Sequence, residues 1–170
     1  TVKKNLVLLG MMAVGKTTLG KIVAKKQELK FIDIDASIEK KNSMTIKEIF
    51  KKKGEKFFRM EEENEILKSL EKNNCVIALG GGAFMNKTVR ENILKNAISI
   101  WLSVDIKTLN QRIKWNRKRP LLKEENNQKK ITELYAERKN IYKLANHQIA
   151  CDKLSKKNIA EKIIALYEKY

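Results

Sequence analysis

Residues 10 to 17 read Gly-Met-Met-Ala-Val-Gly-Lys-Thr and match the phosphate-binding pattern G-x-x-x-x-G-K-[ST] in full. The apolar run 5–9 before the motif has the character of a buried strand, and Leu19, Ile22 and Val23 follow it at helical spacing. A loop between strand and helix gathers backbone N–H groups and the positive end of a helix dipole around an anion. An ordinary glycine turn with a surface lysine is the alternative interpretation. The context favours a nucleoside triphosphate as the first ligand, with Lys16 on its β- and γ-phosphates and the Thr17 hydroxyl as a magnesium ligand.

The chain has 170 residues, of which 42% are hydrophobic, and this suits one domain with a sizeable core. No stretch approaches the roughly 20 apolar residues of a membrane span. The start of the chain has too short an apolar run for a signal peptide, so the sequence predicts a cytoplasmic protein with no membrane partner. Cys75 and Cys151 lie inside apolar segments without metal-ligand spacing and are interpreted as buried, reduced core residues.

The formal net charge of +17 raises the possibility of nucleic-acid binding. The lysines are, however, spread over nearly every expected helix, and aromatic residues are not interleaved with them as single-strand binding requires. We therefore interpret the charge as a solvated lysine-rich surface that assists capture of anionic substrates, and we expect no nucleic-acid partner.

Strand-like and helix-like segments alternate along the chain. Five strands are expected, at residues 5–9, 31–35, 75–79, 97–102 and 148–151. The expected helices after the first one cover residues 36–41, 45–53, 55–72, 86–95, 105–113, 129–144 and 156–170, while the basic stretch 114–128 has the composition of a mobile loop. This alternation predicts an α/β fold, a three-layer sandwich around a five-stranded parallel sheet, with ligands beyond the carboxyl ends of the strands.

Three of these strand ends carry residues suited to phosphoryl transfer. The first leads into the phosphate loop, the second carries Asp33 and Asp35, and the third precedes Gly80-Gly81-Gly82. On a strand, the two aspartates point the same way, so one carboxylate could steady magnesium while the other accepts a proton. Three glycines in a row let backbone approach a ligand closely. Ordinary solvent-facing acids and a flexible turn are the alternatives.

Together with these motifs, Gly54-Glu55-Lys56-Phe57-Phe58-Arg59, Arg119-Pro120-Leu121-Leu122, and Arg138 four residues before Tyr142 resemble the pattern of the shikimate kinase family, in order and over nearly the whole chain. The resemblance implies a single kinase domain over residues 1–170. That domain would have the P-loop kinase fold, substrate-binding helices at about 36–62 and a lid at about 114–128. It also implies transfer of the γ-phosphoryl group of ATP to the 3-hydroxyl of shikimate, a step in aromatic amino acid biosynthesis.

The resemblance gives each matched residue a role. Asp35 would bind the ring hydroxyls and act as general base, and Asp33 with Thr17 would hold Mg²⁺. Arg59 and Arg138 would bind the shikimate carboxylate, where a planar guanidinium makes paired hydrogen bonds that lysine cannot reproduce. The substrate-binding residues implied are Asp35, Arg59, Gly80, Gly81, Gly82 and Arg138. Taken alone, Arg59 could equally be a helix-surface cation paired with neighbouring glutamates.

On the nucleotide side, Lys16 and Arg119 would act on the transferring phosphoryl group, and Arg112 would stack on adenine. The ATP-binding residues implied are Ala13, Val14, Gly15, Lys16, Thr17, Thr18, Arg112, Arg119 and Ser155. Ala13 and Val14 depart from the glycine and small residue that the family usually has there, which puts the path of the loop in question.

Two alternatives remain beside this interpretation. Another small-molecule kinase of the same fold, acting on gluconate or a nucleoside monophosphate, would share the phosphate loop. The combination of Asp33-Ile34-Asp35 with the triple glycine and two carboxylate-binding arginines argues against both acceptors. A basic, nucleotide-dependent nucleic-acid-binding module would bind DNA or RNA in a strongly salt-dependent way. We expect a monomer, with ATP and shikimate as the partners, and a structural or exposed role for His147.

Overall fold

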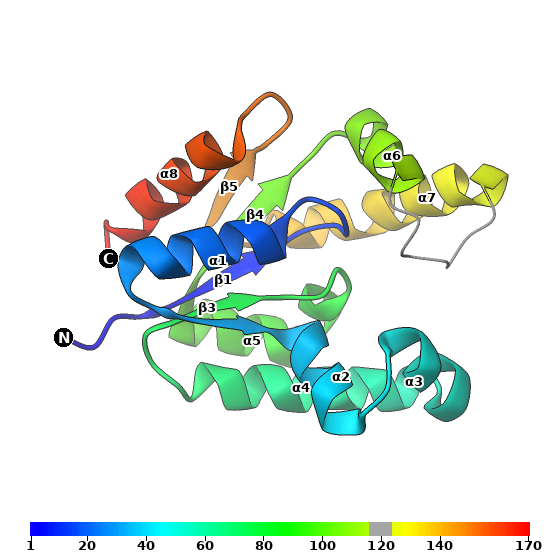
Figure 1. Cartoon of the computed structure of the whole chain (residues 1–170), viewed down its shortest axis with the longest axis horizontal. Helices are drawn as coiled ribbons and strands as arrows, with labels where there is room; N and C mark the ends of the chain where they lie inside the picture. The colour runs from blue at the N-terminus through cyan, green and yellow to red at the C-terminus, as the bar shows by residue number, and fades with distance from the viewer. Residues whose placement is uncertain (116–123) are drawn as a thin grey trace.

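The computed structural model describes the backbone of residues 1–115 and 124–170, and the side chains of residues 1–112 and 128–170. Its centre is a five-stranded parallel sheet in the order β2-β3-β1-β4-β5 (Figure 1). The strands are β1 (Asn5–Leu9), β2 (Lys30–Asp33), β3 (Cys75–Ala78), β4 (Ala97–Ser103) and β5 (His147–Ala150). The prediction of a five-stranded parallel sheet is therefore confirmed.

Helices cover both faces of this sheet. They are α1 (Lys16–Gln27), α2 (Ile34–Asn42), α3 (Ile46–Lys53), α4 (Glu55–Leu70), α5 (Lys87–Asn96), α6 (Ile106–Trp115), α7 (Glu124–Tyr142) and α8 (Lys156–Tyr167), with one short 3₁₀ turn, η1 (Ala83–Met85). Figure 1 shows α1 and α8 on one face and α4 and α5 on the other. The α2–α3 pair and the α6–α7 pair extend beyond the carboxyl ends of the strands, where the chemistry-bearing segments lie.

The central strands β1 and β4 are predominantly hydrophobic because both of their faces are covered, and Asn5, Ser99 and Ser103 are their buried polar residues. Every residue of β1 and of β4 is buried, and β1 lies between β3 and β4 in the sheet. Continuous apolar runs of this kind are what parallel strands with helices on both faces require. The sheet consequently presents only its strand ends to a ligand.

Most element boundaries lie within three residues of the sequence prediction, and two differences change its interpretation. β2 ends at Asp33, because the Asp33 carboxylate accepts the Ala36 backbone N–H at 3.1 Å and caps α2, which begins at Ile34. Helix α7 begins at Glu124, five residues before the expected start at Lys129, so residues 124–128 are helical and not part of a loop. The predicted capping residue Thr45 does cap α3, and Gly54 ends that helix as expected.

The sequence also predicts that the chain has no membrane span, that both cysteines are buried and reduced, and that His147 is structural or exposed. Within the described residues, no helix combines the length and apolar character needed to cross a membrane. Cys75 and Cys151 are fully buried and are not joined in a disulfide. The His147 ring lies 2.9 Å from the Tyr170 hydroxyl and lines neither of the pockets described below, consistent with a structural role.

Candidate active site

The phosphate loop connects β1 to α1 as its sequence predicts. Gly15 has φ 95° and precedes the first turn of α1, and no side chain caps the backbone N–H groups there. The Lys16 ammonium folds back over the loop and donates to the carbonyl oxygens of Gly10 and Met11 at 2.6 and 2.9 Å. Amides, a helix N-terminus and an ammonium group thus converge on one point, which favours phosphate binding.

The departure at Ala13 and Val14 has a structural consequence. Ala13 has φ 64°, in the left-handed region where glycine is more readily accommodated. Val14 is buried and packs against the core, and it also contributes to the lining of the cavity beside the loop. The loop therefore still leads into the N-terminus of α1, but Ala13 adopts a backbone conformation that L-amino acids adopt less easily.

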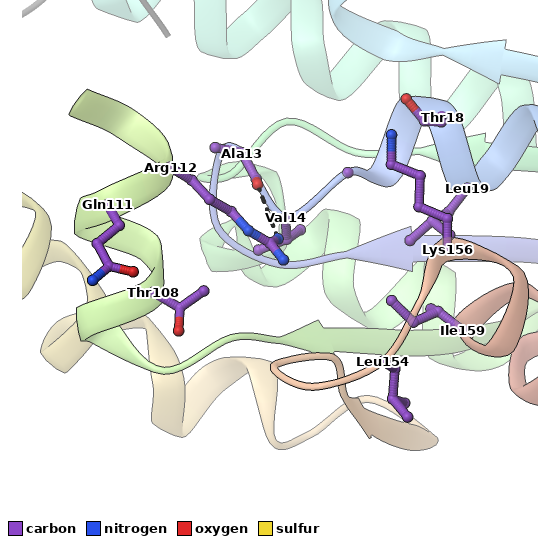
Figure 2. Close-up of a pocket in the computed structure, with 11 residues that line it drawn as sticks. Ala13, Val14, Thr18, Leu19, Thr108, Gln111, Arg112, Leu154, Lys156 and Ile159 are labelled. Atoms are coloured by element: carbon purple, nitrogen blue, oxygen red, sulfur yellow. Dashed lines mark hydrogen bonds between the residues drawn. The ribbon is translucent and has the colours of Figure 1, made fainter. Parts of the chain in front are cut away.

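A cavity of about 710 Å³ lies beside this loop (Figure 2). Thr108, Gln111 and Arg112 of α6 form one side, and Leu154, Lys156 and Ile159 lie on the other side. The Arg112 guanidinium donates to the Ala13 carbonyl at 3.4 Å and thereby connects α6 to the loop. Arg112 and Lys156 are the two charged residues of the cavity lining, and both are basic. The cavity is lined by Ala13, Val14, Gly15, Thr18, Leu19, Thr108, Gln111, Arg112, Leu154, Lys156 and Ile159.

Several residues predicted for nucleotide binding line this cavity, and others do not. Thr18 and Arg112 belong to the lining. Ser155 is not part of it; its hydroxyl accepts the Asn158 N–H at 3.1 Å and caps α8. Arg119 lies outside the described residues, so the structure does not place it.

Thr17 and Asp33 come from different elements and meet at the strand ends. The Thr17 hydroxyl donates to the Asp33 carboxylate at 2.8 Å, while the other carboxylate oxygen caps α2. The sequence predicted that Asp33 and Asp35 would point the same way along a strand, and this geometry is wrong. Asp35 lies in the first turn of α2, because the Asp33 cap turns the chain into a helix before Asp35 is reached.

This helical placement carries Asp35 to the glycine segment after β3. A Cβ atom placed on Gly80 would lie 2.9 Å from one Asp35 carboxylate oxygen. Cβ atoms on Gly81 and Gly82 would lie 2.9 Å from an Arg138 nitrogen and 2.8 Å from two Arg59 nitrogens. Each of the three glycines therefore leaves room for a different charged side chain.

The glycine segment also borders the phosphate loop. The same Cβ position on Gly81 lies 3.7 Å from the Met12 backbone nitrogen and 3.8 Å from the Gly10 carbonyl oxygen. Asp35, Arg59 and Arg138 come from three helices far apart in the sequence. The structure brings them together around the glycines, next to the loop.

Arg59 is held by acids on its own helix. It pairs with Glu62 at 2.9 Å and with Glu55 at 3.6 Å. The Glu62 side chain is buried, and burial raises its carboxyl pKa, with the nearby Asp35 charge adding to the rise and Arg59 opposing it. From the sequence, the glutamates near Arg59 are expected only to pair with it at the helix surface. Nothing in the run of Glu61, Glu62 and Glu63 indicates that Glu62 is buried beside Asp35.

A second cavity, of about 500 Å³, lies between α4, η1 and α7. Its lining includes Arg59, Gly82 and Arg138, together with Glu55, Met85, Asn86, Leu134 and Glu137. Two guanidinium groups at one small cavity form a binding site suited to a carboxylate. Leu134 and Met85 add apolar surface to the same cavity.

The comparisons with known proteins agree with this geometry. Residues 12–168 match the family model described as "Shikimate kinase". The chain belongs to the shikimate kinase family. A shikimate kinase from Sulfurihydrogenibium sp. is 42% identical to it over 161 residues, which are 95% of this chain and 96% of the relative.

Solved shikimate kinases share the whole fold. The enzyme from Acinetobacter baumannii, solved in complex with shikimate, has a TM-score of 0.91 and 32% sequence identity, covering 98% of this chain and 94% of its own. The enzyme from Bacteroides thetaiotaomicron has a TM-score of 0.90 and 28% identity, and 99% of each chain is covered. The resemblance read from the motifs is confirmed, and with it an ATP-dependent phosphotransferase of aromatic amino acid biosynthesis.

Proposed function

We propose that the two cavities are the two substrate sites of this shikimate kinase, with ATP beside the phosphate loop and shikimate between α4, η1 and α7. The observation that carries the proposal is the contact of Asp35, Arg138 and Arg59 with three successive glycines that border the phosphate loop. A relative that shares 32% identity has been solved with shikimate bound, which supports shikimate as the ligand of the second cavity.

In the acceptor site, Arg59 and Arg138 bind the shikimate carboxylate. Paired, charge-assisted hydrogen bonds from a guanidinium are among the strongest that a neutral-pH site can offer. The ion pairs with Glu62 and Glu55 hold Arg59 in place. Because Gly82 has no side chain, the Arg59 guanidinium has room to face the cavity. Gly80 and Gly81 border the substrate through backbone.

Asp35 acts at the opposite end of the substrate. Its carboxylate binds the ring hydroxyls and accepts the proton of the 3-hydroxyl as that oxygen attacks the γ-phosphorus of ATP. A bond forms between this oxygen and phosphorus, and the bond from phosphorus to the bridging oxygen of ADP breaks. Lys16 at the phosphate loop stabilises the charge that moves onto the leaving ADP.

The nucleotide binds along the loop and the first cavity. Backbone groups of residues 13–18 contact the phosphates, and the Arg112 guanidinium stacks on adenine across the cavity. Ser155 contributes to the nucleotide site through the turn at the start of α8, and Arg119 acts on the transferring phosphoryl group. We further infer a single domain over residues 1–170 that acts as a monomer.

The residues present fit a magnesium ion. The Thr17 hydroxyl and the Asp33 carboxylate are hard oxygen donors within 2.8 Å of each other at the mouth of the loop. Bound there with ATP, Mg²⁺ would neutralise charge on the β- and γ-phosphate oxygens. Asp33 keeps one oxygen on the α2 backbone, which fixes the direction of the other.

A crystal structure with ADP and shikimate tests these assignments together. We expect the shikimate carboxylate within hydrogen-bond distance of Arg59 and Arg138, and its 3-hydroxyl facing Asp35. A carboxylate bound elsewhere, or a 3-hydroxyl turned away from Asp35, would refute the acceptor site as described.

A further inference from the structure

Tyr142 ends α7 in a fully buried position behind the glycine segment. Its ring packs beside Trp101 of β4, with ring centroids 5.6 Å apart. The hydroxyl donates to the Gly81 carbonyl and lies 3.7 Å from the Met11 sulfur. A phenol has one proton, and the carbonyl is the stronger acceptor, so the contact with sulfur is a packing contact between α7 and the phosphate loop.

Arg138 lies one helical turn before Tyr142, on the same face of α7. Burial raises the pKa of Tyr142 to about 12, and the charge of Arg138 and a hydrogen bond from it act in the opposite direction. The Arg138 guanidinium therefore lies close to the phenol oxygen, whose proton is given to the Gly81 carbonyl. One buried hydroxyl connects a carboxylate-binding arginine to the glycine beside it.

The fit around Gly81 makes this connection tight. A Cβ atom on Gly81 would lie 2.9 Å from the Arg138 guanidinium, so the two residues are already in contact without a side chain between them. The Tyr142 hydroxyl, through its hydrogen bond to the Gly81 carbonyl, holds the backbone of Gly81 against the Arg138 guanidinium. A guanidinium held at two points keeps its direction better than one held by its flexible stem alone.

We propose that Tyr142 is a positioning residue that fixes Arg138 and Gly81 for recognition of the substrate carboxylate. This inference rests on the proposed function of the second cavity. It predicts that the loss of one hydroxyl, which touches no substrate, weakens recognition of the carboxylate and leaves the nucleotide site almost unchanged.

The chain offers a matched control in Tyr167. Tyr167 is also buried, and its hydroxyl also donates to a backbone carbonyl, that of Lys4 at 2.6 Å. Burial raises the pKa of its hydroxyl as well. Tyr167 lines neither of the two cavities. Replacing either tyrosine by phenylalanine keeps the ring and removes a similar hydrogen bond.

The experiment compares wild type, Tyr142→Phe and Tyr167→Phe, with melting temperatures to show that all three are folded. Steady-state rates are measured with ATP against shikimate and against shikimate methyl ester, which lacks the carboxylate charge. For Tyr142→Phe we expect the KM for shikimate to rise about tenfold, the KM for ATP to stay within about twofold, and the preference for shikimate over the ester to fall about tenfold. Tyr167→Phe should keep wild-type values.

Two results would overturn the proposal in distinguishable ways. If wild type turns over shikimate and Tyr142→Phe keeps both the KM for shikimate and the preference over the ester, the tyrosine is a core residue with no positioning role. If wild type itself does not phosphorylate shikimate, the proposed function fails and this inference fails with it.

Discussion

Three successive glycines, Gly80 to Gly82, illustrate how single residues build this site. None of them has the positive φ that would demand glycine for backbone reasons; that conformation occurs at Gly10, Gly15 and Gly54. Their identity follows from the space that Asp35, Arg138 and Arg59 occupy. A side chain at any of the three would push a charged group out of the acceptor site.

Arg59→Lys tests the bidentate contact. Lysine keeps the charge but cannot form two parallel hydrogen bonds, so we expect the KM for shikimate to rise by about one to two orders of magnitude while the KM for ATP changes little. Initial rates with each substrate varied in turn measure both constants. Equal increases in the two would place Arg59 outside the acceptor site.

Asp35→Asn tests the general base. The amide fills the same space between α2 and Gly80 but cannot accept the hydroxyl proton, so kcat should fall about 10²- to 10⁴-fold. Circular dichroism and the melting temperature should show an intact fold. Turnover near the wild-type rate in the folded variant would rule out proton transfer to this carboxylate.

Glu62 gives the site a pH-dependent stability. Its pKa is raised by burial above the ordinary value of 4.5, so the folded state holds this proton more tightly than the unfolded state. Its contribution to stability is then greatest at low pH and decreases as pH rises from 4.5 through the raised pKa.

In Glu62→Gln this titration is absent. The unfolding free energy of the variant minus that of wild type should therefore increase as pH rises from about 4 to 7. Urea unfolding at several pH values measures the difference. A difference that stays constant or decreases with pH would contradict the raised pKa.

At the scale of the element, most boundaries could be predicted from hydrophobic runs and capping residues. The apolar run that became β4 and the capping residue Thr45 are local signals, and both elements formed as predicted. The end of β2 could not be predicted, because Asp33 fits both the end of a strand and a helix cap, and only the bond from the Ala36 N–H to its carboxylate distinguishes the two.

The same limit applies to the site. The phosphate loop, Asp35, Arg59 and Arg138 each carry a chemical signal in the sequence, and the structure brings these residues to the same strand ends. Glu62 carries none, because its importance comes from burial, and the spacing of Tyr142 after Arg138 matches the family pattern but does not predict the contact of Tyr142 with Gly81. Only the packing of α4 and α7 around the glycine segment reveals them.

Gly54 determines how α3 and α4 meet. It has φ 85° and ψ 165°, a region that is essentially restricted to glycine, and a Cβ there would meet nothing within 4 Å. Gly54→Ala should therefore cost about 1–3 kcal/mol of unfolding free energy through backbone strain alone. Urea denaturation measures it.

The matched control for this prediction is Lys52→Ala, at an exposed position in the last turn of α3, which should change stability by less than about 0.5 kcal/mol. If Gly54→Ala proves as mild as this control, the junction between α3 and α4 does not depend on the glycine conformation.

For the whole molecule, the parallel sheet explains why the two proposed substrate sites adjoin. The ends of β1, β2 and β3 lie at the same edge, so the phosphate loop, the α2 cap and the glycine segment become neighbours. The charged residues that line the nucleotide cavity are both basic, in keeping with an overall charge of +17 and an anionic ligand. The charge therefore fits capture of anionic substrates.

The most direct test of the account is ADP release, followed in a coupled assay with ATP and, side by side, shikimate, gluconate and nucleoside monophosphates. Two arginines that line one cavity, with Asp35 beside the neighbouring glycine segment, predict a kcat/KM for shikimate at least about a hundredfold above that for any other acceptor. No turnover with shikimate, or equal turnover with gluconate, would contradict it.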